Sequence, residues 1–116
     1  MKIMIVDDNP GMRDVVKSML ASTEAEFIEC EDGGDAVLRY NQFQPDWVLM
    51  DLSMRGVDGL SAVTQLKAMF SDCRIIVVTD YDERVLRDKA KELGADAYVL
   101  KENLHEIPFI INSILK

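Results

Sequence analysis

The sequence predicts an α/β protein in which helices cover both faces of a five-stranded parallel sheet. Short aliphatic runs recur at regular intervals, and apolar residues at helical spacing lie between them. The runs are almost continuously apolar, as expected of strands that are buried on both faces of a sheet. They occupy residues 3–6, 26–30, 47–50, 74–78 and 97–100. Together with five helical stretches they give a (βα)5 chain, which we expect to form one domain over residues 1–116.

The helical stretches have apolar residues three or four positions apart, so each has one face suited to packing on the sheet. In the first stretch Asn9 suits the N-cap and Pro10 the first helical position. The faces that we expect to be buried are Met12, Val15, Val16, Met19 and Leu20 in the first, Ala36, Val37 and Tyr40 in the second, Leu60, Val63, Leu66, Met69 and Phe70 in the third, Val85, Leu86, Ala90 and Leu93 in the fourth, and Leu104, Ile107, Ile110, Ile111, Ile114 and Leu115 in the fifth.

The ends of the later helices also have recognisable signals. Asp58 lies near the start of the third helix, Gly94 suits the position after the end of the fourth, and Pro108 falls close to the first turn of the fifth. The methionines at helical spacing, including Met12, Met19 and Met69, are interpreted as core residues.

Composition and charge exclude several classes of protein. The 116 residues are 48% hydrophobic and 29% charged, which is typical of a soluble globular protein rather than a disordered one. The net charge of −8 argues against direct nucleic-acid binding, because phosphate contacts need clustered Lys and Arg. The sequence contains no apolar run long enough to span a membrane and no secretory signal, so we expect a cytoplasmic protein without membrane contact.

The Cys and His residues do not suggest a zinc site or a disulfide framework. Cys30 and Cys73 are far apart in sequence, and buried free thiols are the simpler interpretation. His105 lies on a polar helix face and is interpreted as a solvated surface residue.

Charged and polar side chains follow four of the predicted strands. Asp7 and Asp8 come after the first strand, Asp51 after the third, Thr79 after the fourth and Lys101 after the fifth. The carboxyl ends of parallel strands meet at one edge of a sheet, which is where ligands of such folds bind. We therefore expect these five side chains to converge on one cleft.

This set of residues favours phosphoryl transfer to a carboxylate. Several carboxylates close together repel one another and need a compensating cation, and oxygen ligands of this kind suit Mg²⁺. An amine and a hydroxyl are suited to hold the oxygens of a phosphoryl group, and an aspartate can itself be the nucleophile.

These residues resemble the receiver domains of two-component response regulators. The resemblance covers essentially the whole chain, through the acidic pair, DLSMRGVDG at residues 51–59, Thr79, and GADAYVLK at residues 94–101. It implies a flavodoxin-like fold with strand order 2-1-3-4-5. It also implies a signalling domain that catalyses only its own phosphorylation and dephosphorylation.

The resemblance assigns roles to individual residues. Asp51 would accept a phosphoryl group from a sensor histidine kinase or a phosphotransfer protein, and Thr79 and Lys101 would contact its oxygens. The Mg²⁺ ligands would be Asp8 directly, Asp7 mainly through water, Asp51, and the carbonyl of Ser53.

Thr79 would then move toward the phosphate and Tyr98 would turn inward, which alters the surface of the fourth helix, fifth strand and fifth helix. An output domain or a homodimer partner would bind that surface. A half-buried core aromatic is the other interpretation of Tyr98.

The chain departs from the family pattern at three positions. Arg55 and Glu102 stand where proline is usual, and Asp80 stands where a small residue is usual. Glu102 removes the reason to expect a cis peptide after Lys101, since a non-proline cis bond costs about 2.5–4 kcal/mol. An acidic Asp80 would hinder a phosphodonor. The run ending in Lys101 and Glu102 looks like that of regulators with a helix-turn-helix DNA-binding domain, so a regulator of transcription and a stand-alone receiver both stay open.

Three further interpretations remain. Asp7 and Asp8 could cap the first helix rather than bind a metal. The domain could be an interaction module that works without phosphorylation and has a degenerate pocket. A phosphatase with an Asp nucleophile is a third alternative, but such enzymes typically have a second Asp two residues downstream, where this chain has Ser53.

Overall fold

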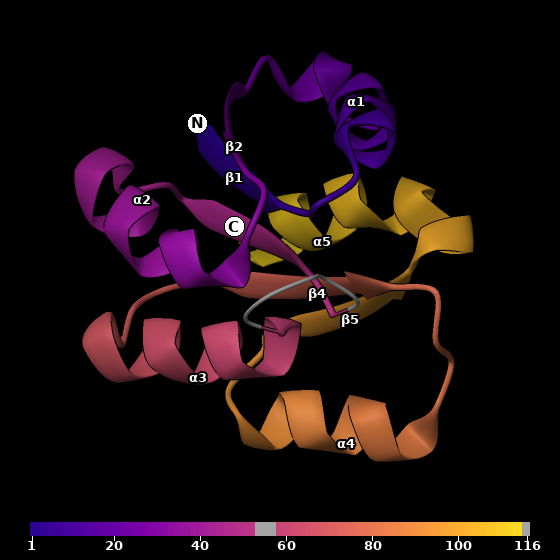
Figure 1. Cartoon of the computed structure of the whole chain (residues 1–116). Coiled ribbons are helices and arrows are strands. Elements are labelled where there is room, and N and C mark those ends of the chain that lie inside the picture. The colour runs from indigo at the N-terminus through magenta and orange to yellow at the C-terminus, as the bar shows by residue number, and fades with distance from the viewer. Residues whose placement is uncertain (53–57, 115–116) are drawn as a thin grey trace.

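The predicted strands form a single parallel sheet with the order β2-β1-β3-β4-β5 (Figure 1). The computed structural model describes residues 1–52 and 58–114. Its strands are β1 (Lys2–Val6), β2 (Glu26–Cys30), β3 (Trp47–Asp51), β4 (Ile75–Thr79) and β5 (Ala97–Leu100). Each boundary lies within one residue of its prediction. The predicted fold class and strand order are therefore confirmed.

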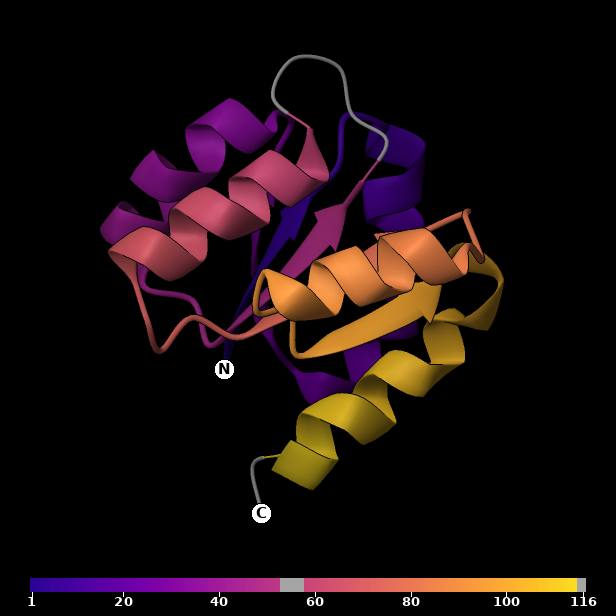
Figure 2. The ribbon, with the colours of Figure 1, turned by 90° about the horizontal axis from the view of Figure 1, so that it is seen from below.

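The helices cover both faces of this sheet. They are α1 (Pro10–Met19), α2 (Ala36–Phe43), α3 (Gly59–Met69), α4 (Arg84–Glu92) and α5 (Ile107–Ile114), with short 3₁₀ segments η1 (Ala21–Thr23), η2 (Gly33–Asp35) and η3 (Lys101–Glu106). Figure 1 and the turned view in Figure 2 show α1 and α5 on one face and α2, α3 and α4 on the other. No helix in the described ranges is long and apolar enough to cross a bilayer.

Two cores result because successive strand residues point to opposite faces. Ile3 and Ile5 of β1 pack toward α1 and α5 with Val16, Leu20 and other apolar residues. Met4 and Val6 pack toward the opposite helices, in a cluster that includes Tyr40, Val63, Leu66 and Ala90. Cys30 and Cys73 are buried in this second core as free thiols, as predicted. The fold therefore rests on a sheet with both faces buried.

Short polar contacts set the helix boundaries. The Asn9 side chain accepts a hydrogen bond from the Met12 amide at 3.2 Å, and the Asp58 side chain accepts one from the Ser61 amide at 2.8 Å. Gly94 follows α4 with a φ of +102°, a conformation that favours glycine. The predicted N-cap Asn9 and the predicted end of α4 are confirmed.

Among the side chains that the structure describes, four apolar ones predicted to be buried are instead exposed; Leu115 and the side chain of Ile114 lie outside the described part. Val15 and Met19 of α1 are 47% and 40% exposed, and Met69 of α3 and Val85 of α4 are 64% and 78% exposed. The buried residues of α1 are Arg13 and Val16, followed by Leu20 just after its end. The buried stripe of α1 is thus rotated away from Val15 and Met19, which lie on its flank. The expectation that Met19 and Met69 are core residues was wrong.

The fifth helix begins later than predicted. Residues 101–106 form the 3₁₀ segment η3, and α5 begins at Ile107 with Pro108 as its second residue. Proline lacks an amide hydrogen, and its ring clashes with the carbonyl four residues earlier, which here belongs to Leu104. An α-helix therefore cannot run unbroken from Leu104 through Pro108.

Candidate functional site at the carboxyl edge of the sheet

Strand register places the predicted site residues beside one another. Val6 of β1 is the register partner of Met50 of β3, so Asp7, directly after β1, lies next to Asp51, the last residue of β3. Thr79, the last residue of β4, is the register partner of Leu100, and Lys101 comes next. The strands therefore deliver Asp7, Asp51, Thr79 and Lys101 to one edge of the sheet.

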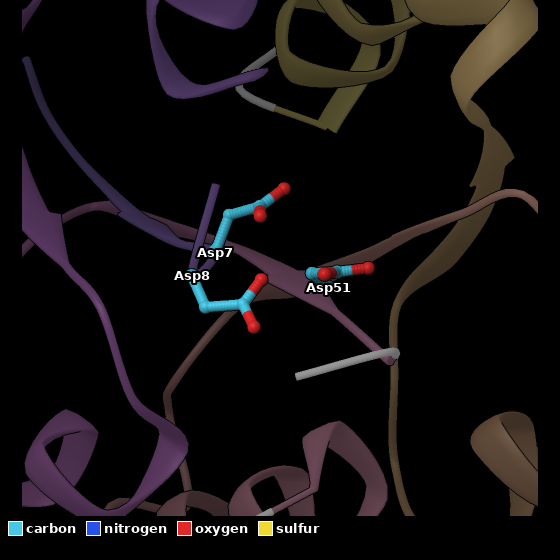
Figure 3. A group of neighbouring side chains, drawn as sticks. All are labelled: Asp7, Asp8 and Asp51. Carbon is cyan, nitrogen blue, oxygen red and sulfur yellow. The ribbon is translucent and has the colours of Figure 1, made fainter. Parts of the chain in front are cut away.

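Three carboxylates form a compact group at this edge. One oxygen from each of Asp7, Asp8 and Asp51 lies within 4.8 Å of the other two. Figure 3 shows the three side chains as neighbours at this edge. Asp7 is 4% exposed and Asp51 2% exposed, whereas Asp8 is intermediate. Two of the three charges are thus largely removed from water, which strengthens their mutual repulsion.

Lys101 lies against two of these carboxylates. Its Nζ is 3.3 Å from Asp51 Oδ1 and 3.5 Å from Asp7 Oδ2, and its side chain is 12% exposed. Burial of the Lys101 amine opposes its charge, but the negative charges of Asp51 and Asp7 outweigh burial and raise the pKa of Lys101 above its usual value. The amine is therefore a cation at neutral pH. It balances one of the three negative charges.

This arrangement fits a hard divalent cation. For unit charges about 4 Å apart, repulsion is roughly 1 kcal/mol per pair in water and about 4 kcal/mol at an effective dielectric constant of about 20. Asp7, Asp8 and Asp51 present only oxygen ligands, which suit Mg²⁺. The fourth predicted ligand, the Ser53 carbonyl, lies outside the described residues, as does Arg55.

Thr79 and Tyr98 contact the same backbone segment. Thr79 is fully buried, and its Oγ1 accepts a hydrogen bond from the Tyr81 amide at 3.2 Å. Tyr98 is partly buried, and its hydroxyl donates to the Tyr81 carbonyl at 2.6 Å. Burial raises the pKa of Tyr98, which keeps that hydroxyl protonated. Tyr81 therefore connects the two residues of the predicted switch.

The alternative interpretation, that Asp7 and Asp8 cap α1, is only partly correct. Asn9 is the residue that caps α1. Asp7 supports the turn before it, since its Oδ1 accepts a hydrogen bond from the Asn9 amide at 2.9 Å. Its other oxygen faces Lys101. Asp7 thus both braces the turn and contributes to the acidic group.

Two of the residues that depart from the family pattern, Asp80 and Glu102, lie around this edge. Asp80 is exposed directly after Thr79, and its negative charge adds to those that raise the pKa of Lys101. Glu102 is exposed, and the peptide bonds of the described residues are all trans. His105 is exposed, as predicted.

Two contributors to the site were missed from the sequence. Tyr81 acts through its backbone, which no side-chain pattern reveals. Arg13 is buried in α1 and donates to the backbone carbonyl of Asp7. The one available signal was a positive residue six positions after Asp7, inside a helix whose other inward positions are apolar.

Comparisons with known proteins agree with this geometry. Residues 3–111 match the family model of the response regulator receiver domain. The chain is 37% identical over 110 residues to the transcriptional regulatory protein YdfI of Bacillus subtilis, covering 93% of this chain and 51% of YdfI. It is 32% identical to the chemotaxis protein CheY of Halobacterium salinarum, covering 86% of this chain and 83% of that protein.

A solved structure gives the same result. A two-component response regulator of the LuxR family from Aurantimonas sp. SI85-9A1 superposes with a TM-score of 0.91 at 31% identity, covering 98% of this chain and 84% of the other. The chain spans about half the length of YdfI. Because the family model covers nearly the whole chain and a relative of similar length is over 30% identical, the chain belongs to the family of response regulator receiver domains.

Proposed function

We propose that this domain is a phosphoacceptor switch that takes a phosphoryl group on Asp51 in a Mg²⁺-dependent reaction. The donor is a phosphohistidine of a sensor histidine kinase or phosphotransfer protein, in an exchange that we place in the cytoplasm. A carboxylate oxygen of Asp51 bonds to phosphorus as the bond between phosphorus and the imidazole nitrogen breaks. The histidine keeps the electron pair of that bond, and Asp51 becomes an acyl phosphate.

The grouping of Asp7, Asp8 and Asp51 beside Lys101 is the observation that carries this proposal. Three carboxylates and one amine leave a net charge of about −2 if all are ionised, so an incoming phosphoryl group would be repelled. The three Asp residues would hold Mg²⁺, which supplies positive charge for the phosphoryl oxygens when bound. Lys101 would exchange part of its contact with Asp51 for those oxygens, and Thr79 would donate its hydroxyl to them.

The shared contacts of Thr79 and Tyr98 support a switch. If Thr79 turns its hydroxyl toward a phosphoryl group, its bond from the Tyr81 amide changes. The Tyr81 carbonyl, which accepts from Tyr98, belongs to the same loop. Phosphorylation adds about −1.5 to −2 charge units and strong hydrogen-bond acceptors at one point, enough to bias such an equilibrium. The surface of α4, β5 and α5 would then change for an output domain or a second copy.

We infer that the output is control of transcription through a DNA-binding domain outside this chain. YdfI is named a transcriptional regulatory protein, and the chain matches 51% of its length. The net charge of −8 disfavours direct DNA contact by the receiver itself. On this proposal the domain is not an enzyme that turns over an external substrate.

Mass spectrometry of the protein treated with Mg²⁺ and acetyl phosphate tests this proposal. We expect one added phosphoryl group, mapped to Asp51, that depends on Mg²⁺ and is absent in Asp51→Asn. Asp46→Asn is the matched control, because it makes the same change just before β3, at the other end of that strand. An equal mass increase in Asp51→Asn would exclude Asp51 as the acceptor.

An interaction module that needs no phosphorylation is the second candidate, and Asp80 favours it. This exposed carboxylate adds negative charge beside Thr79, at the edge where an anionic donor must approach. A folded wild-type protein that binds a partner but gains no phosphoryl group from acetyl phosphate or from a kinase would establish this alternative. Phosphorylation that becomes faster in Asp80→Ala would instead show that Asp80 only slows the switch.

A further inference from the structure

Arg13 is a charged residue among the buried residues of α1, where the other buried residue is the apolar Val16. It is 7% exposed, and it occupies an inward position of α1 three residues before the buried Val16. A buried charge is costly unless it is paired and hydrogen-bonded, so the contacts of its guanidinium indicate what it is there to hold.

The guanidinium of Arg13 joins the ends of β1 and β2. Nη1 donates to the backbone carbonyl of Asp7 at 2.6 Å, and Nε donates to Glu29 Oε1 at 2.9 Å. Nη2 lies 3.8 Å from Glu31 Oε1. The hydrogen bond from Arg13, followed by that from Lys17, lowers the pKa of Glu29. Arg13 is thus anchored on β2 by carboxylates while it reaches the acidic loop after β1.

The main chain at Asp7 is held from both sides as a result. Its amide donates to the Cys30 carbonyl at 3.0 Å, and its carbonyl accepts from Arg13. That carbonyl belongs to the planar peptide unit that also contains the amide nitrogen of Asp8. A fixed carbonyl therefore fixes the plane from which the Asp8 side chain departs.

We propose that Arg13 is a positioning residue for the cation site, which holds the peptide between Asp7 and Asp8 so that both carboxylates face Asp51. This inference rests on the proposed function, since the cation is the one that phosphorylation of Asp51 requires. Arg13 does not touch the cation; it acts through the backbone. Outer residues that orient metal ligands typically change metal affinity by about 10–100-fold when removed.

The direction in which Mg²⁺ affinity changes when Arg13 is removed distinguishes a positioning role from a simple effect of charge. Arg13 is a positive charge close to the acidic group, so its removal should strengthen Mg²⁺ binding if charge alone mattered. Positioning predicts weaker binding. Loss of a merely structural contact would lower the unfolding temperature without changing the affinity of the folded protein.

Calorimetric titration of the protein with Mg²⁺ tests the inference. We expect Arg13→Met to weaken Mg²⁺ binding by about 10-fold or more. Arg13→Lys should give an intermediate affinity, because one ammonium replaces a fork that reaches both Asp7 and Glu29. Lys17→Met is the matched control: Lys17 Nζ lies 3.2 Å from Glu29 Oε2 and makes no contact with Asp7 among the contacts described. Its removal should leave Mg²⁺ affinity unchanged or slightly stronger.

Phosphorylation by acetyl phosphate gives an independent readout. Arg13→Met should need more Mg²⁺ for half-maximal rate and recover the wild-type rate at saturating Mg²⁺. Equal or tighter Mg²⁺ binding by folded Arg13→Met would overturn the inference while leaving the proposed function intact. If Arg13→Met does not fold, wild-type affinity in Arg13→Lys would overturn it. A wild-type protein that binds no Mg²⁺ would instead overturn the proposed function.

Discussion

Gly59 shows how one missing side chain shapes the site. It is the first residue of α3, and this first turn passes directly beside the end of β3. A Cβ on Gly59 would lie 2.2 Å from the Asp51 carbonyl oxygen and 2.7 Å from the Leu52 Cα. Both are backbone atoms, which cannot move aside as the tip of a flexible side chain can. Only glycine allows α3 to begin this close to Asp51.

We expect Gly59→Ala to destabilise the protein and to slow phosphorylation of Asp51. Forcing an extra methyl group into a packed site costs about 1–3 kcal/mol, and here the group that must shift is the Asp51 backbone. This loss should exceed the gain of about 1 kcal/mol that alanine brings to a helix over glycine. Urea unfolding and the rate of modification by acetyl phosphate measure the two effects.

Gly11→Ala is the matched control for that change. A Cβ on Gly11 would meet only the Asn9 Oδ1 at 3.2 Å, a side-chain atom that can adjust. Gly11 also lies in the first turn of a helix, so Gly11→Ala should change stability little or raise it. A Gly59→Ala protein as stable and as reactive as Gly11→Ala would show that α3 can shift without disturbing Asp51.

At the scale of elements, α2, α3 and β4 meet in a buried corner around Cys73. Cys73 is 1% exposed and its thiol interacts with the Tyr40 hydroxyl of α2. The centroid of the Tyr40 ring lies 4.5 Å from that of Phe70. Lys67 of α3 donates to the Cys73 carbonyl and pairs with Asp96 at 3.2 Å. Burial raises the pKa of Cys73 to about 11 and that of Tyr40 to about 12.

These shifts predict a loss of stability at alkaline pH. A thiol whose pKa rises from 9.0 in the unfolded chain to about 11 in the fold stays protonated when folded. The contribution of this thiol to the free energy of unfolding is complete below pH 9. It is lost as the pH rises toward 11, because the thiol ionises in the unfolded chain before it ionises in the fold. Between pH 8 and pH 10 the Cys73 thiol should account for a loss of about 1 kcal/mol.

Urea unfolding of wild type and Cys73→Ala at both pH values measures this contribution. The cavity left by alanine destabilises the variant at both pH values, so it cancels when the pH dependence is compared. Between pH 8 and pH 10, we expect the free energy of unfolding of Cys73→Ala to fall by about 1 kcal/mol less than that of wild type. An equal loss in both proteins would mean that the thiol titrates normally in the fold.

The elements could be predicted from sequence to different degrees. The strands were predictable within a residue because burial on both faces leaves continuous apolar runs such as IIVV. The buried faces of the helices were less predictable. Val15 and Met19 of α1 have the spacing of a buried helix face, yet both are exposed. Arg13 takes an inward position instead, because Asp7 and Glu29 accept hydrogen bonds from its guanidinium. Apolar spacing alone carries no information about such a partner on another strand.

The site could be predicted where it depends on side-chain chemistry at strand ends, as for Asp51 and Lys101. It could not be predicted where backbone atoms make the contact. Tyr81 takes part through its amide and carbonyl, and Arg13 reaches a carbonyl of Asp7. Every residue has these backbone groups, so no residue type marks them in the sequence.

At the scale of the whole molecule, negative charge makes stability sensitive to cations. The chain carries a net charge of −8, and three of its carboxylates are gathered at one edge of the sheet. Ions in general screen the net charge, whereas a site-bound ion adds binding free energy to the folded state alone. The two effects can therefore be separated by their dependence on the ion and on the site.

We expect Mg²⁺ to stabilise the fold beyond the effect of ionic strength. A ligand present at about 100 times its dissociation constant contributes about 2.7 kcal/mol. At roughly 4 °C per kcal/mol for a domain of this size, that raises the unfolding temperature by about 10 °C. Thermal unfolding followed by circular dichroism, in MgCl₂ and in NaCl of equal ionic strength, measures the difference. Intrinsic fluorescence gives a second readout of the same unfolding, because Trp47 is fully buried at the start of β3 and becomes exposed when the chain unfolds.

Two variants with the same change of charge decide whether the acidic group is the origin of this stabilisation. Asp8→Asn removes one of the three gathered carboxylates, and it should abolish most of the Mg²⁺-specific rise. Asp72→Asn removes an exposed carboxylate before β4, at the opposite edge of the sheet, and it should keep the full rise. If both variants lose the rise equally, or if NaCl reproduces it in wild type, Mg²⁺ acts by screening. The edge formed by Asp7, Asp8 and Asp51 would then not be a metal site.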